Sequence, residues 1–298
     1  MSDQAINLEK LKRNKKWKQR ALVTAFLAPA LLLSLGIIVY PILNTFVRSF
    51  TDELTGSFTL DNYVFLFTNK IASADIWYTI WVTLVTVVLA ILLAYLLALY
   101  LRFSPSRIAK VIGTLYLLPR FIPGLVAVYA VKVIISDSGL LNRLSLLLPE
   151  PAALYGFKPG LLFNYKGIIL MNLWFNIPFA AMIIVAALSG ISDSIIESAR
   201  DVGAGRFRIF FQMILPLSIR DVMIAMTFIF MSNISSFTTP YLIGGNFPQM
   251  MGVYLRKQFS NRNYELAAAV SVLIFLFSSV SAIVYIYTNL KDKEWEKG

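Results

Sequence analysis

The feature that most constrains this chain is a series of long apolar runs separated by shorter polar segments. A run of about 18 or more nearly uncharged residues can cross the hydrocarbon core of a bilayer as a helix. Only 14% of the residues are charged, whereas soluble domains carry about 25%. We therefore predict an all-α, polytopic membrane protein with six transmembrane helices. The predicted helices cover residues 21–47, 77–101, 109–135, 167–189, 218–243 and 264–289.

The polar segments predict how the chain is oriented and divided. Residues 1–20 are strongly basic, and the apolar run that follows is too long for a signal peptide and lacks its small-residue cleavage site. Lys and Arg are enriched in the segments that would share the N-terminal side, as cytoplasmic segments are. We therefore expect both termini in the cytoplasm, a six-helix transmembrane domain at 21–290 and a cytoplasmic tail at 291–298.

Composition excludes several classes of function. The chain contains no Cys and no His, so thiolate nucleophiles, imidazole bases, disulfides and Cys/His metal sites are absent. The net charge of +11 fits cytoplasmic Lys and Arg on a membrane protein, and we expect no nucleic-acid partner. The predicted span cores carry no Asp or Glu, which argues against a proton-coupled carrier and against a carboxylate-only enzyme. We predict no catalytic residue and no metal site.

The polar segment 190–217 has the most specific local pattern. Ser194 and Glu197 have the S-x-x-E spacing of a capping box, which predicts the start of a short helix. Gly203 is placed to end that helix, because Gly adopts the left-handed cap conformation at little cost. A second short helix could cover 206–215 before the fifth span begins. Taken separately, these features fit an ordinary interhelical loop equally well.

As a whole, the segment resembles the signature loop of permease subunits of binding-protein-dependent ABC importers. That signature reads E-A-A-x-x-x-G and later I-x-L-P. It stands here as Glu197-Ser198-Ala199, Gly203 and Ile214-Leu215-Pro216, with Ser in place of the usual Ala and a shortened final motif. The stretches "ESARDVGAG" and "SFTTPYLIGGNFPQM" look like the polyamine/iron/thiamine/phosphonate group of these permeases, whereas "FTLDNYVFL" and "NYELAAAVSVLIFLF" also resemble sugar permeases.

This resemblance implies a type I importer permease fold in the bacterial inner membrane, with loop 190–217 carrying a coupling helix. The chain has no G-x-x-x-x-G-K-[ST], so ATP and Mg would bind to two separate ATPase subunits and no cofactor to this chain. A second permease subunit, an extracytoplasmic substrate-binding protein and the lipid bilayer would be its other partners. The residues expected to couple to the ATPase are Glu197, Ser198, Ala199, Arg200, Gly203, Ala204 and Arg206, although topology alone also explains the arginines.

Polar residues within the predicted spans are candidates for the solute pathway, because their burial in lipid is costly. Arg120 falls near the middle of the third span, where it could bind an anionic group, cap carbonyls freed by Pro119 and Pro123, or snorkel. The lack of intramembrane acids argues against a polyamine, so we expect a small polar solute, neutral or anionic. A sugar or oligosaccharide is the alternative, and a secondary carrier is the weaker one. The other pathway candidates, which could instead hydrogen-bond between helices, are Asn172, Asn176, Asn233 and Ser236.

Overall fold

The computed structural model describes residues 3–147 and 157–295, and within these ranges the chain is built from helices with no named strand. Six helical segments are long and apolar enough to cross a membrane, which confirms the predicted fold class. These segments are Leu22–Ser49, Lys70–Phe103, Gly124–Ser145, Tyr165–Ser189, Arg206–Ile234 and Tyr264–Tyr287. The predicted tail at 291–298 lies partly outside the described residues.

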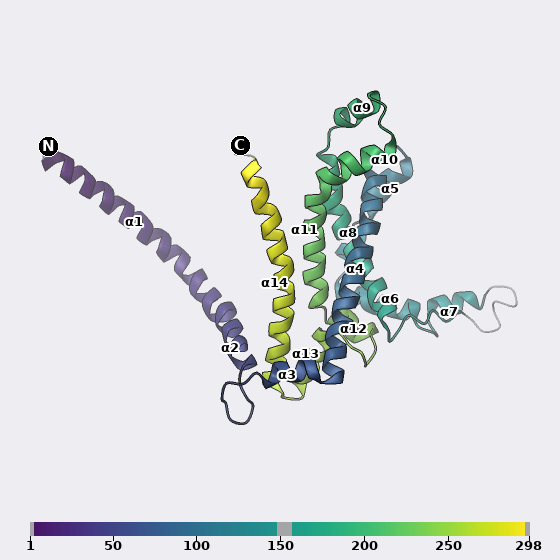
Figure 1. Ribbon diagram of the computed structural model, residues 1–298, viewed down its shortest axis with the longest axis horizontal. Helices are drawn as coiled ribbons and strands as arrows, with labels where there is room; N and C mark the ends of the chain where they lie inside the picture. The colour runs from purple at the N-terminus through teal and green to yellow at the C-terminus, as the bar shows by residue number, and fades with distance from the viewer. Residues whose placement is uncertain (1–2, 148–156, 296–298) are drawn as a thin grey trace.

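The helices follow one another in the order shown in Figure 1, with the first two joined by a π turn at Leu35–Val39. Their bounds are α1 Asp3–Ser34, α2 Tyr40–Ser49, α3 Asp61–Thr68, α4 Lys70–Phe103, α5 Arg107–Leu115, α6 Gly124–Ile135, α7 Leu140–Ser145, α8 Tyr165–Ser189, α9 Asp193–Asp201, α10 Arg206–Ile209, α11 Leu215–Ile234, α12 Thr238–Ile243, α13 Met251–Ser260 and α14 Tyr264–Trp295.

A bundle of α4, α8, α11 and α14 forms the centre of the molecule (Figure 1). The facing sides of α4, α8 and α11 are rich in alanine, for example at Ala94, Ala180 and Ala225, all fully buried. Such small residues let helices approach closely, so that van der Waals contact can hold them together in lipid. We call the two ends of this bundle the α9 end and the α13 end, after the short helices found there.

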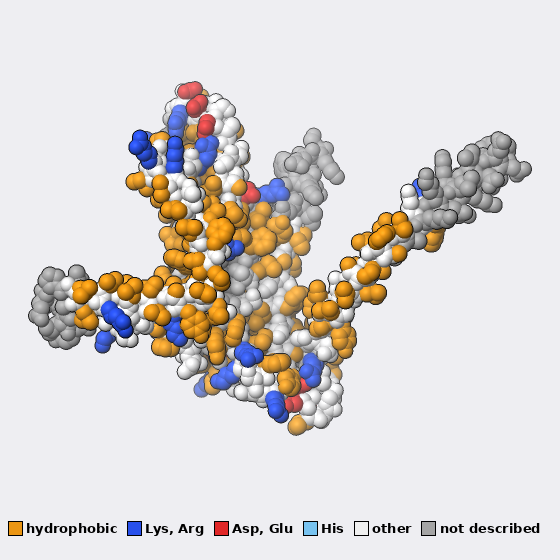
Figure 2. Space-filling view, turned by 180° about the vertical axis from the view of Figure 1, so that it is seen from behind, with side chains coloured by type: hydrophobic (Ala, Val, Ile, Leu, Met, Phe, Trp, Pro, Cys, Tyr) orange, Lys and Arg blue, Asp and Glu red, His pale blue; other side chains and the backbone are white. Residues whose placement is uncertain are grey.

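The first membrane helix leaves the bundle. Its last part, α2, packs against α14, and α1 extends away at an angle (Figure 1). No residue in the most apolar part of Leu22–Ser49 is buried. Figure 2 shows this arm covered with apolar side chains along much of its described length. The arm is therefore held at one end only, near the α13 end.

The predicted third span, 109–135, is wrong as a continuous helix. The structure divides it into α5, a 3-10 turn at Leu118–Phe121 and α6, and the membrane-spanning candidate is instead Gly124–Ser145. Pro119 and Pro123 explain the interruption, because each lacks a backbone N–H and disfavours helical geometry at the preceding residue. Arg120 consequently lies in a turn rather than in the middle of a helix.

The predicted fifth span, 218–243, is also misplaced. The helix starts earlier, at Arg206, and passes through a π turn at Phe210–Ile214, so the expected short helix at 206–215 is part of the span. It ends at Ile234, where Ser235 takes a non-helical conformation, and α12 is a separate short helix. The second span is longer than predicted, because Asn69 caps α4 by accepting hydrogen bonds from the amides of Ile71 and Ala72.

Candidate functional site

The short helix α9 stands at one extremity of the molecule, within the predicted coupling loop (Figure 1). It begins at Asp193 after the N-cap residue Ser192, whose side chain makes no capping bond. The predicted capping box of Ser194 and Glu197 is therefore wrong. Ser194 already lies in the first turn of the helix, and its hydroxyl is 3.1 Å from that of Ser192.

The end of α9 matches the prediction for Gly203. This residue has φ +82°, its amide donates to the carbonyl of Arg200 at 2.8 Å, and the amide of Ala204 donates to the carbonyl of Ala199 at 3.0 Å. These two bonds form a Schellman motif, which satisfies carbonyls at the end of a helix and requires a left-handed residue. Gly203 therefore fixes where the chain turns back towards the bundle.

The two faces of α9 differ. Ile196 and Ala199 are buried against the bundle core, and Ala204 is half-buried beside them. The other predicted coupling residues, Glu197, Ser198, Arg200, Gly203 and Arg206, are exposed. Figure 2 shows positive and negative side chains together at this tip.

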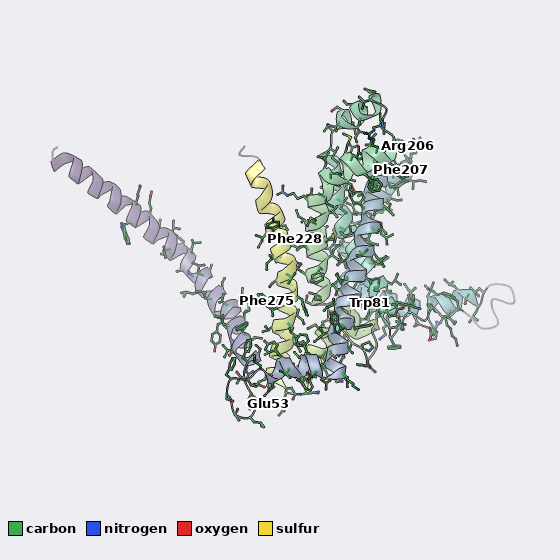
Figure 3. All side chains as sticks on the ribbon, in the orientation of Figure 1. Glu53, Trp81, Arg206, Phe207, Phe228 and Phe275 are labelled. Atoms are coloured by element: carbon green, nitrogen blue, oxygen red, sulfur yellow. The ribbon has the colours of Figure 1, made fainter. Side chains whose placement is uncertain are left out.

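Two apolar side chains at the same tip were missed by the sequence analysis. Val202 is 85% exposed and Phe207 is 81% exposed (Figure 3 labels Phe207 beside Arg206). Two exposed apolar side chains beside charged residues are candidates for contact with another protein. The sequence feature that indicates Phe207 as a contact residue is its place between two arginines, at 206 and 208, in the polar segment 190–217.

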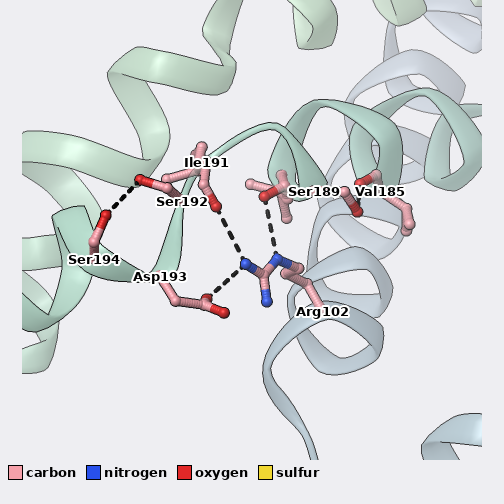
Figure 4. A network of polar contacts seen from close by, with 8 residues as sticks. Arg102, Val185, Ser189, Ile191, Ser192, Asp193 and Ser194 are labelled. Atoms are coloured by element: carbon pink, nitrogen blue, oxygen red, sulfur yellow. Dashed lines mark hydrogen bonds and ion pairs between the residues drawn. The ribbon is translucent and has the colours of Figure 1, made fainter.

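Arg102, at the last turn of α4, joins α9 to the bundle (Figure 4). Its guanidinium donates to the carbonyls of Leu188 at 3.3 Å and Ile191 at 3.1 Å, and to the Oδ1 of Asp193 at 2.6 Å. The two carbonyls lie at and just beyond the end of α8, where cations complement the helix dipole. One side chain thus connects the ends of α4 and α8 with the start of α9.

The pathway candidates are distributed over three elements. Arg120 is exposed, and its guanidinium carbon lies 5.1 Å from the ring centroid of Phe179 on α8. Asn172 and Asn176 are buried on α8, and the Nδ2 of Asn172 has no hydrogen-bond partner. Asn233 is buried on α11, where its Nδ2 donates to the carbonyl of Ile229 at 2.7 Å. Ser236 lies half-buried in the break between α11 and α12.

The structure also contains a buried acid that the sequence analysis placed outside the membrane spans. Asp75 is fully buried in α4, and its Oδ1 accepts the backbone amide of Gln249 at 2.8 Å. One turn further along, the Oγ1 of Thr79 accepts the amide of Met251 at 2.8 Å. The prediction of spans free of acids was therefore wrong for α4. These bonds attach α4 to the segment between α12 and α13.

A polar cavity of about 420 Å³ lies beside this attachment. Its lining includes Gln249, Asn246 and two cationic residues of α13, Arg256 and Lys257. Tyr254 lies on the buried side of α13. Burial raises the pKa of its hydroxyl, and the charge of Asp75 raises it further, so the hydroxyl stays neutral. The α13 end thus offers a positively charged hollow. Among the described residues, no group of three or more His, Cys, Asp or Glu is placed to hold a metal.

Comparison with known proteins gives consistent results. Residues 87–296 match the family model described as binding-protein-dependent transport system inner membrane component. The sulfoquinovosyl glycerol transport system permease SmoG of Agrobacterium fabrum is 29% identical, over 94% of this chain and 95% of that protein. The spermidine/putrescine permease PotB of Salmonella typhimurium is 23% identical over 62% of this chain, and the match spans 64% of PotB, under two thirds of its length.

Solved structures show the same fold. A chain of a bacterial ABC transporter involved in the import of the acidic polysaccharide alginate aligns with a TM-score of 0.69 and 20% identity. The alignment covers 95% of this chain and 99% of that one. A chain of the methionine ABC transporter MetNI aligns with a TM-score of 0.53 and 13% identity, over 73% and 96% of the two chains. At these identities the likeness concerns the fold.

Proposed function

This chain belongs to the family of binding-protein-dependent transport system inner membrane components, and we propose that it is a permease subunit of an ATP-driven importer. In this proposal it forms, with a second permease, the pathway for a small polar solute that an extracytoplasmic binding protein delivers. ATP and Mg bind to two partner ATPase subunits, and both termini of this chain face the cytoplasm. The α9 end is then the cytoplasmic end and the α13 end is the outer one.

The observation that carries this proposal is the tip formed by α9 and the start of α10. The tip extends beyond the bundle (Figure 3) and exposes Val202 and Phe207 beside arginines. Apolar anchors surrounded by cations suit docking into a groove on a protein with acidic residues. Gly203 permits close approach because it has no side chain, and the Schellman motif keeps α9 in a fixed orientation.

The first membrane helix supports the presence of a second permease. Its most apolar part buries nothing within this chain, although it contains large side chains such as Phe26 and Leu32. In a pair of permeases this arm can lie against the partner on one side and lipid on the other. The pathway residues Arg120, Asn172, Asn176, Asn233 and Ser236 would then line only half of the route.

The solute is proposed to be neutral or anionic. Asp75 is buried and holds the amide of Gln249, so it provides no open acidic surface for a polycation. The exposed Arg120 and the cavity with Arg256 and Lys257 are positively charged. A sugar or oligosaccharide is the second candidate, because the match to the sulfoquinovosyl glycerol permease extends over nearly the full length of both chains.

A reconstituted importer tests the proposal. Gly203→Asp forces a side chain into the left-handed conformation and adds a negative charge at the docking tip. We expect normal membrane insertion, loss of ATPase binding and loss of ATP-driven uptake. Gly56→Asp is the matched control, because Gly56 also has a positive φ with open space around it but lies in a loop near the α13 end. It should leave ATPase binding and uptake unchanged.

Two results would contradict the proposal. The first is ATP-driven uptake that survives in the Gly203→Asp variant, which would remove the coupling role from α9. The second is uptake by this chain alone in liposomes without an ATPase, which would favour a secondary carrier.

A further inference from the structure

Helix α4 connects the two ends of the molecule without interruption. It has 34 residues and contains neither Pro nor Gly, so it is about 50 Å long and free of the usual causes of kinks. The third predicted span is broken and α11 continues from a π turn, whereas α14 is also continuous and contains neither Pro nor Gly. Helix α4 can move as a rigid body, and hydrogen bonds hold it to other segments near both of its ends.

Both ends of α4 are attached to segments that are distant in sequence. At the α13 end, Asp75 and Thr79 hold the amides of Gln249 and Met251, as described above. These bonds are fully buried, so water does not compete for them. A displacement of α4 would therefore carry Gln249, which lines the 420 Å³ cavity.

At the α9 end, Arg102 is the attachment. Its three hydrogen bonds reach Leu188, Ile191 and Asp193, and its side chain is only 21% exposed. A bond between two ionised groups at 2.6 Å is stronger than a neutral one, and the two carbonyls fix the direction of the guanidinium. A displacement of α9 would therefore act directly on α4.

We propose that α4 transmits the position of α9 to the cavity beside Gln249, with Arg102 as the positioning residue at one end and Asp75 at the other. The proposal rests on the proposed function, in which α9 moves when the ATPase binds nucleotide. It adds that the outer cavity changes with the nucleotide state and identifies the helix that carries the change.

The test uses the whole importer in lipid, with an environment-sensitive fluorophore on Asn246→Cys. The chain has no Cys, so this label is unique within it, and Asn246 lines the cavity. In the wild-type background, addition of ATP should change the fluorescence. In Arg102→Ala we expect ATP hydrolysis to continue. The fluorescence change and the uptake per ATP hydrolysed should each fall about fivefold or more, which is the size of an ordinary coupling between distant sites.

Four further variants separate positioning from simple loss of charge. Asp193→Ala removes the ion pair and leaves both carbonyl contacts, so it should give a smaller loss, and the double variant should be no worse than Arg102→Ala. Arg102→Lys should keep part of the response, because an ammonium can still reach an acceptor. Arg107→Ala removes an exposed cation near the same end and should behave as wild type.

The outcomes are distinguishable. A wild-type importer without ATP-driven uptake would refute the proposed function itself. Uptake without any fluorescence change at Asn246, or an Arg102→Ala variant whose uptake and hydrolysis fall in equal proportion, would refute the role of α4 alone. If Arg102→Ala fails to insert, Asp193→Ala decides, because its side chain is 69% exposed and tolerates replacement. An unchanged response in that variant would overturn the proposal.

Discussion

At the scale of single residues, Gly203 and Gly205 offer a test of why glycine is needed at the end of α9. Neither position has any atom within 4 Å of an added Cβ, but Gly203 has φ +82° whereas Gly205 has φ −70°. Gly203→Ala should therefore lower the free energy of local opening of α9 by about 1 kcal/mol, and Gly205→Ala should not. Amide hydrogen exchange of α9 should be about fivefold faster in the first variant. Equal exchange rates in both would contradict the argument.

Residues whose role depends on local chemistry could be predicted from the sequence, whereas residues with distant partners could not. The helix end at Gly203 follows from the conformational freedom of glycine and needs no knowledge of the fold. The partners of Asp75 and Arg102 lie 174 and 91 residues away along the chain. The predicted second span, 77–101, therefore leaves both Asp75 and Arg102 just outside it. The mistaken capping box shows that even a local motif fails when the helix begins two residues earlier than expected.

At the scale of elements, the interrupted third span determines what Arg120 can do. Hydropathy predicted one continuous apolar span, but Pro119 and Pro123 interrupt it at Leu118–Phe121. The turn at Leu118–Phe121 places Arg120 against Phe179 of α8, with the side chain exposed. The guanidinium is held beside a ring, and in the proposed pathway its exposed side would face the solute.

Two substitutions separate a pathway role of Arg120 from a packing role. Arg120→Ala should slow uptake of an anionic solute about tenfold, the effect of losing one hydrogen bond to a charged group. Phe179→Leu removes the cation–π contact, together with the edge-to-face contact of Phe179 with Phe228, and should slow uptake by no more than about fivefold. Uptake rates in proteoliposomes provide the measurement. Equal losses in the two variants would show that Arg120 acts by holding α8, and a neutral solute should be unaffected by either.

At the scale of the whole molecule, the first membrane helix is the part of the fold with the least contact to the rest of the chain. Hydropathy predicted that Leu22–Ser49 enters the membrane, but hydropathy cannot distinguish lipid from a protein neighbour. Within this chain the helix is attached near its end, where Arg48 lies 3.8 Å from Glu265 and over the ring of Tyr264. This ion pair, whose side chains are 49% and 14% exposed, lies at the end of the arm and so does not fix its far part.

Cross-linking from the arm tests whether a second permease covers it. Photoreactive groups attached at Phe26→Cys and Leu32→Cys, which are 78% and 68% exposed in the native residues, should form adducts with the second permease in the assembled importer. The pair Ile42→Cys and Phe275→Cys is the internal control, because both residues line one cavity between α2 and α14 and should be joined within the chain by a bifunctional reagent. Adducts with lipid alone at both arm positions would contradict a protein neighbour at these two side chains, because a side chain that packs against a second subunit is shielded from lipid.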